Sequence, residues 1–173
     1  MKNYWLHLPS TEFYKHLIFK YKIYYTMATG LLHLHNVLRW VILIFLLINI
    51  INQISGNRKI GLSKILLISA HTTLLIGLYQ YFTGQVGFNT IVQNGFGECM
   101  KDSALRFWAV EHILGNILGI VFITISHVKL KKGGNPRTSA YLLMVALIII
   151  MVSIPWPFRD LGIARALFPG MSV

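Results

Sequence analysis

Acidic residues are scarce in this chain. Its 173 residues include 5 Asp and Glu against 16 Lys and Arg, and charged residues make up only 12% of the total. A soluble globular domain carries about 25% charged residues, so the composition excludes an ordinary water-soluble fold. Because Cys99 is the only cysteine, an intramolecular disulfide and a CxxC-type metal motif are excluded as well.

The excess of basic residues gives a formal net charge of +11. Such a charge can indicate nucleic-acid binding, but the sequence contains no soluble basic domain to carry that function. The lysines and arginines lie in short connectors and near the N-terminus, a distribution typical of membrane topology. We therefore expect the lipid bilayer as a partner, and no nucleic acid.

Hydrophobic residues are abundant, at 55% of the chain. They form four long apolar segments, each close to the ~20 residues that a helix needs to cross ~30 Å of hydrocarbon. These segments cover about residues 31–52, 62–82, 105–128 and 139–155. The sequence thus predicts an all-α fold, an integral membrane up-down four-helix bundle.

Two connectors, 52–64 and 129–140, would lie at the same end of this bundle, which we call the basic end. They contain seven basic residues and no acidic one. The connector at the opposite end, 83–104, has Lys101 offset by Glu98 and Asp102. The positive-inside rule makes the basic end cytoplasmic. We expect an inner-membrane protein of bacteria with a periplasmic C-terminus.

The first 26 residues fit this orientation poorly, because four lysines there would resist export: Lys2, Lys15, Lys20 and Lys22. The stretch "MATGLLHLHN" begins at Met27 and reads like a natural start. We expect residues 1–26 to be an extension outside the mature protein, or else a short interfacial segment. The transmembrane domain is then 27–160, and 161–173 is a C-terminal tail.

Three histidines fall in the half of the bundle opposite the basic end. At 1.5 Å per residue, His35 lies about 6 Å into its segment, His112 about 10 Å and His71 about 16 Å. A haem b needs one imidazole on each face, and His35 and His112 match in depth on two segments that are diagonal in a simple bundle. His71 with His112 is a second possible pair, whereas His127, at the basic end, is expected to be a packing residue.

Residues near His112 are compatible with a flat ligand. Gly115 and Gly119 lie on the same helical face as His112 and could leave room for a macrocycle. The same two glycines also form a small-xxx-small motif, which is common at plain contacts between membrane helices. Both interpretations remain open at the sequence level.

Charged residues near the same end could assist a cofactor. Arg39, Arg106 and Arg159 could bind haem propionates through charge-assisted hydrogen bonds, or could be simple interfacial anchors. Glu111 could pair with Arg39 or relay a proton. Ionisable side chains within membrane segments are functional by default.

The stretches "TGLLHLHNVLRW", "ISAHTTLLIGLYQYF", "MKDSALRFWAVEHILGNI" and "IPWPFR" resemble small four-helix membrane proteins of Bacteroidota labelled cytochrome b-like. The similarity covers residues 27–160 and implies a four-helix membrane bundle that binds haem. The chain is more distantly similar to bacterial cytochrome b561, whose two haems use four histidines, one of them on the last helix. The fourth segment here has no histidine, so that comparison extends to the architecture only.

These observations predict a membrane-bound electron-transfer protein with one haem b, working between the quinone pool and a redox partner protein. A non-haem metal site with His35, His71 and His112 as ligands, assisted by Glu111, is the first alternative. A cofactor-free structural subunit of a membrane complex is the second. No substrate pocket or enzyme signature can be read from the sequence.

Overall fold

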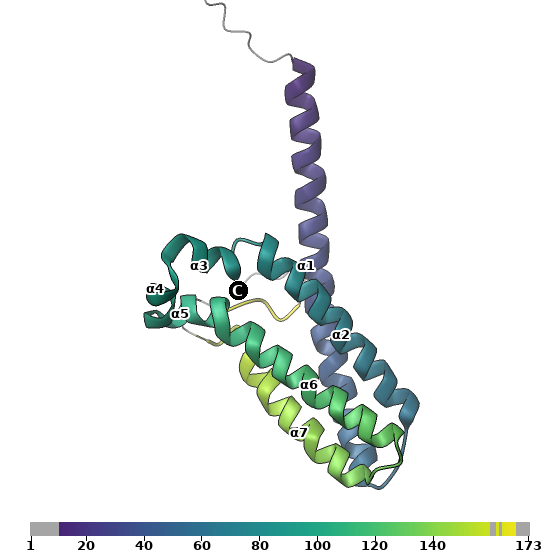
Figure 1. Ribbon diagram of the computed structural model, residues 1–173. Helices are drawn as coiled ribbons and strands as arrows, with labels where there is room; N and C mark the ends of the chain where they lie inside the picture. Colours follow the sequence, from purple (N-terminus) through teal and green to yellow (C-terminus); the bar gives the residue numbers. More distant parts are fainter. Residues whose placement is uncertain (1–10, 160–161, 163, 169–173) are drawn as a thin grey trace, which may run out of the picture.

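The computed structural model describes residues 11–159, 162 and 164–168, and all regular structure in this part of the chain is helical (Figure 1). The elements in chain order are α1 (Thr11–Ile54), α2 (Ile60–Thr83), α3 (Phe88–Asn94), α4 (Phe96–Lys101), α5 (Ser103–Arg106), η1 (Phe107–Glu111), α6 (His112–Lys131) and α7 (Pro136–Ser153). The predicted all-α class is confirmed. Four stretches are long and apolar enough to cross a membrane: Tyr14–Ile54, Ile60–Asn94, Ser103–Lys131 and Pro136–Ser153.

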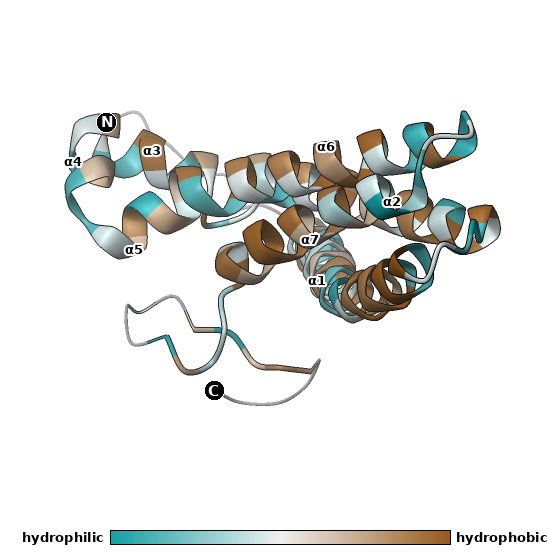
Figure 2. Ribbon diagram, turned by 90° about the horizontal axis from the view of Figure 1, so that it is seen from below, coloured by the Kyte–Doolittle hydropathy of each residue, from teal (hydrophilic) through white to brown (hydrophobic). Residues whose placement is uncertain are grey.

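The four long helices pack in a closed order. α1 lies against α2 and α7, and α6 lies against the same two helices, so α1 and α6 face each other diagonally. Each helix contributes a fully buried aliphatic side chain to one shared core: Leu46, Leu66, Ile123 and Leu143. Seen from below, α7 and the part of α1 within the bundle are mainly hydrophobic along their length (Figure 2).

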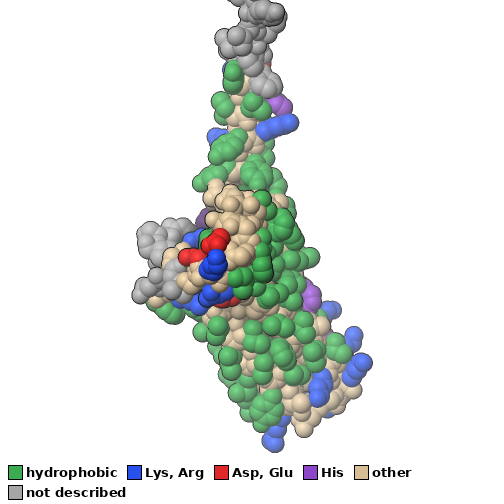
Figure 3. Space-filling view, turned by 60° about the vertical axis from the view of Figure 1, so that its left-hand side comes forward, with side chains coloured by type: hydrophobic (Ala, Val, Ile, Leu, Met, Phe, Trp, Pro, Cys, Tyr) green, Lys and Arg blue, Asp and Glu red, His purple; other side chains and the backbone are tan. Residues whose placement is uncertain are grey.

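The basic end closes with two short connectors, and a hydrogen bond joins them. The Arg58 guanidinium Nη2 donates to the Gly133 carbonyl, which places residues 55–59 beside residues 132–135. Figure 3 shows Lys and Arg side chains gathered at this end, below a face that is mostly hydrophobic. A belt of apolar surface next to a basic rim is the pattern expected of a chain that sits in a bilayer.

The opposite end is more structured than a plain connector. Three short helices, α3 to α5, lead into η1, a π-helical turn that runs directly into α6 (Figure 1). The carboxylate of Asp102 caps α5 by accepting from the Leu105 backbone N–H at 2.8 Å. Gly87 and Gly95 have φ of +84° and +77°, a left-handed region where glycine avoids the clash of a Cβ, and they set the turns on either side of α3.

Helix α1 is much longer than the predicted segment 31–52. Its 44 residues span about 66 Å at 1.5 Å per residue, roughly twice the hydrocarbon thickness. The first turns project well beyond the rest of the molecule (Figure 1). The helix passes through the predicted boundary at residues 26 and 27 without a break. Residues 1–10 lie outside the described part of the chain.

Candidate functional site

His35 of α1 and His112 of α6 meet across the bundle. Their ring centroids lie 6.4 Å apart, with an angle of 54° between the ring planes. An imidazole nitrogen binds a metal ion at about 2 Å, so two imidazoles on opposite sides of one ion have centroids roughly 6 Å apart. The spacing of this pair is compatible with two ligands of one ion, and it is also an ordinary distance between packed rings.

His112 is held in one orientation. Its Nδ1 lies 2.8 Å from the Ser153 carbonyl oxygen, which can only accept, so Nδ1 carries the proton and donates. The lone pair is then on Nε2, the nitrogen left for a ligand. Donation from the other ring nitrogen to a backbone carbonyl is the usual way in which a metal-binding histidine is oriented. Phe107 and Trp108 of η1 pack against the ring, with centroids 5.7 Å from it.

His35 lies in a close contact with α2. A Cβ added to Gly77 would come within 3.2 Å of His35 Cε1, so the missing side chain of Gly77 makes room for the imidazole. The Nδ1 of His35 is buried and has no hydrogen-bond partner among the described residues. Gly77 was not predicted as a site residue, although it is the only glycine in the apolar segment 62–82.

Other buried polar atoms near His35 also lack partners within the part of the chain that the structure describes. On α1 these are Asn36 Oδ1 and Arg39 Nε, both within about one turn of His35, and on α2 the atom is Gln80 Nε2. Gln80 follows Gly77 by three residues, so it lies on the same side of α2. Unpaired buried polar groups are uncommon in folded proteins and often mark a missing water, ion or ligand. Their presence here fits a bound polar or ionic group.

His71 lies apart from the pair. It is exposed, and its Nδ1 lies 2.9 Å from the carbonyl oxygen of Leu67 in its own helix. The described part of the chain contains no group of three or more His, Cys, Asp or Glu side chains that could hold a metal ion. The predicted three-histidine metal site and the alternative His71–His112 pair are therefore not assembled. The three histidines were predicted at similar depths along their helices. In the structure, however, the side of α2 that faces α1 carries Gly77, and His71 points outward.

Gly115 and Gly119 serve the contact between α6 and α7. A Cβ on Gly115 would lie 1.9 Å from Ser153 Oγ, and one on Gly119 would lie 2.5 Å from Ile150 Cγ1. The space beside both glycines is filled by α7 rather than left open for a macrocycle. Of the two interpretations of this motif, the structure favours the helix–helix contact.

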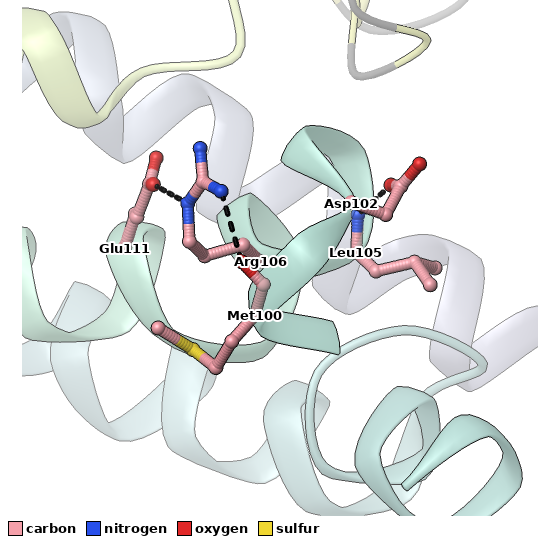
Figure 4. Close-up of polar contacts among 5 residues, drawn as sticks. All are labelled: Met100, Asp102, Leu105, Arg106 and Glu111. Atoms are coloured by element: carbon pink, nitrogen blue, oxygen red, sulfur yellow. Dashed lines mark hydrogen bonds and ion pairs between the residues drawn. The ribbon is translucent and has the colours of Figure 1, made fainter. Parts of the chain in front are cut away.

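Arg39, Arg106 and Arg159 were predicted to bind propionates or to anchor the interface, and the structure gives them different hydrogen-bond partners. Arg106 Nε binds Glu111 at 2.6 Å and its Nη1 binds the Met100 carbonyl at 3.1 Å (Figure 4). Arg159 Nη1 donates to the Val152 carbonyl at 2.8 Å, at the end of α7. The expected pairing of Glu111 with Arg39 is therefore not found, because Arg106 lies closer on the same segment.

Arg39 stays beside the histidine pair and meets the C-terminal tail. Its Nη2 donates to the carbonyl of Leu167 at 2.7 Å, and Trp40 Nε1 donates to the same oxygen at 2.8 Å. From the tail, Phe168 stacks on Trp40 with centroids 5.4 Å apart, and Arg165 lies 4.7 Å from the ring centre of Trp108. The tail thus touches neighbours of both histidines, a role that its sequence did not reveal.

His127 is a buried packing residue in this structure. Its Nδ1 lies 2.9 Å from Ser63 Oγ, which joins α6 to α2 at the basic end. His127 follows His112 by fifteen residues on the same helix, α6, about 22 Å along the axis. It therefore belongs to a different part of the bundle, as its position in the sequence predicted.

Comparison of the chain with protein-family models, with curated proteins and with solved structures gives no match. The resemblance to cytochrome b-like proteins therefore remains a prediction that rests on the quoted residues.

Proposed function

We propose that this protein is a membrane-bound electron-transfer protein that holds one haem b between His35 and His112. The observation that carries the proposal is a pair of neighbouring histidines that, in the described part of the chain, belongs to no group of three or more His, Cys, Asp or Glu side chains. A structural or catalytic zinc site uses three or four protein ligands. A haem brings four nitrogens of its own, so two imidazoles complete its coordination. A site with two histidines therefore suits haem better than a free metal ion.

The proposal places the four long helices across a bacterial inner membrane as an up-down bundle, with the basic end in the cytoplasm. Four sufficiently long apolar stretches support this placement, as does the absence of acidic residues from the two connectors at the basic end. The histidine pair then lies in the half nearer the periplasm. Electrons would pass between the quinone pool and a redox partner on that side.

When bound, haem supplies the one-electron chemistry, and the chain supplies its surroundings. His112 is oriented by the Ser153 carbonyl, and His35 lies against Gly77. Arg39 Nε is the unpaired buried donor closest in sequence to the pair, so Arg39 is the arginine best suited to a propionate. Phe107 and Trp108 pack against His112, and Arg165 of the tail lies over the Trp108 ring.

The deciding experiment is a reduced-minus-oxidised absorption spectrum of the protein purified in detergent after expression with ample haem. We expect a Soret band and the sharp visible bands of a low-spin haem with two histidine ligands. Bound metal without a Soret band would support the non-haem alternative. Protein without haem or metal that purifies within a larger membrane complex would support the structural-subunit alternative.

A further inference from the structure

A second set of buried polar side chains lies at the basic end, far from the histidine pair. Each long helix contributes one member within about 6 Å of its end, at 1.5 Å per residue. The members are at most 8% exposed, and we call them the polar layer: Gln53 of α1, Ser63 of α2, His127 of α6 and Ser139 of α7. Four buried polar side chains at one level of the four helices require an explanation, because burying them is costly.

Some of this cost is offset by hydrogen bonds between helices. Ser63 Oγ lies 2.9 Å from His127 Nδ1, and the backbone carbonyl of Ser139 accepts from Ser126 Oγ at 3.0 Å. Three side-chain atoms are left over. Both amide atoms of Gln53 and the Oγ of Ser139 are buried without a partner among the described residues. Gln53 is 1% exposed and Ser139 0%, so any partner of these atoms has to lie inside the bundle.

The chemistry of these leftover atoms restricts what can bind to them. Gln53 Nε2 and the Ser139 hydroxyl can donate, whereas Gln53 Oε1 can only accept. A guest that satisfies them must itself both accept and donate. A metal cation does not accept, a quinone does not donate, and both would leave one of the amide atoms unpaired. Water does both, and buried water typically makes about three hydrogen bonds to such groups.

We propose that the polar layer is a water-binding site that fills from the basic end. The ordered water bridges Gln53 of α1 and Ser139 of α7, two helices that pack against each other. The layer lies within about one helical turn of the ends of the long helices, so water enters it from the basic end. This site does not depend on the histidine pair, so it stands whether or not the protein binds haem.

Chemical labelling of introduced cysteines tests the proposal. The thiolate of a cysteine attacks a methanethiosulfonate, releasing the sulfinate and forming a mixed disulfide, and the thiolate forms readily only in contact with water. We would compare Ser139→Cys with Leu143→Cys, which lies one turn deeper on the same face of α7 and is 1% exposed. A small charged methanethiosulfonate would be added to inverted membrane vesicles, and the modified peptide would be identified by mass spectrometry, so that native Cys99 does not interfere.

We expect Ser139→Cys to react at least tenfold faster than Leu143→Cys. Equal rates at the two positions, fast or slow, would overturn the proposal, because they would mean that the layer is no wetter than the apolar core.

A second variant covers the case in which the cysteine variants do not fold. Gln53→Met keeps the length of the side chain and removes both unpaired atoms. If the layer is dry, this change removes a penalty and raises the thermal midpoint. If water is bound, the change removes its partners, and we expect an unchanged or lower midpoint. Asn49→Leu is the reference, because Asn49 Nδ2 donates to the carbonyls of Phe45 and Leu62 and its loss is destabilising in both cases. A rise in the midpoint for Gln53→Met would refute water binding.

Discussion

His35 and His112 are the residues on which the proposed cofactor depends. We expect His35→Ala and His112→Ala each to abolish the haem spectrum while the protein remains in the membrane, since four apolar helices insert without a cofactor. His71→Ala is the matched control, because His71 is exposed and bonds only to its own helix in the structure. It should keep a full spectrum. Retention of a low-spin spectrum by His112→Ala would show that another residue is the ligand.

Gly115 and Gly119 give a prediction about stability. An alanine at Gly119 would place its Cβ 2.5 Å from Ile150 Cγ1, so α6 and α7 must move apart. We expect Gly119→Ala to lower the free energy of unfolding by about 1–3 kcal/mol, as overpacking of a tight contact does. Gly61→Ala is the control, because nothing lies within 4 Å of its added Cβ. That variant should be neutral or slightly more stable in a thermal unfolding assay. A loss of equal size in both variants would contradict the packing role.

The residues of the site were only partly predictable from the sequence. The rise per residue of a helix gave the depth of each histidine, and so it brought His35 and His112 to the same level. It could not say which way a side chain points around the helix axis, and that angle separates His71 from the pair. Arg39 was predicted as a site residue, but its hydrogen bond to the tail and the contact of Gly77 with His35 join distant parts of the chain, which no local pattern encodes.

The turn η1 is the element that positions His112. π-Helical turns often occur at functional sites, because one extra residue per turn shifts the side chains that follow. Tyr81 of α2 supports this turn by donating from its hydroxyl to the Ala109 carbonyl at 2.8 Å. We expect Tyr81→Phe to lower the free energy of unfolding by about 0.5–1.5 kcal/mol, the usual value of one such bond.

A further effect of Tyr81→Phe should appear in the spectrum. If η1 relaxes, the bands of the proposed haem should shift or broaden, because His112 follows the turn directly. Tyr79→Phe is the control, since the Tyr79 side chain is 47% exposed on the outside of α2. Identical behaviour of the two variants would mean that the hydrogen bond to Ala109 does not support the turn.

Long and short elements differed in how well the sequence predicted them. The four apolar segments are confirmed as helices, because twenty hydrophobic residues in a row carry a strong signal. Helices α3 to α5 have only four to seven residues each and were expected to be a plain connector. Helices this short are not stable alone and form through contacts with the rest of the fold. The length of α1 was missed because its first turns carry lysines and aromatic residues rather than an apolar run.

The orientation of the whole molecule can be tested by cysteine labelling of intact cells. Native Cys99 is fully buried and is a poor reporter. Lys101→Cys and Lys132→Cys, both at exposed positions, lie at opposite ends of the bundle. We expect an impermeant reagent to modify position 101 and to leave position 132 untouched until the cells are opened. The reverse pattern would show that the basic end faces outward.

The tail follows the four long helices in the order of synthesis. A ribosome delivers a chain from its N-terminus at about 5–20 residues per second, so Leu167 emerges after all four long helices. Until its carbonyl reaches Arg39 and Trp40, the flank of the bundle next to His35 is uncovered. Each newly made molecule therefore passes through a stage in which the helices are complete and this flank is still open. If the protein binds haem as proposed, the cofactor can enter at this stage, and docking of the tail then covers this flank.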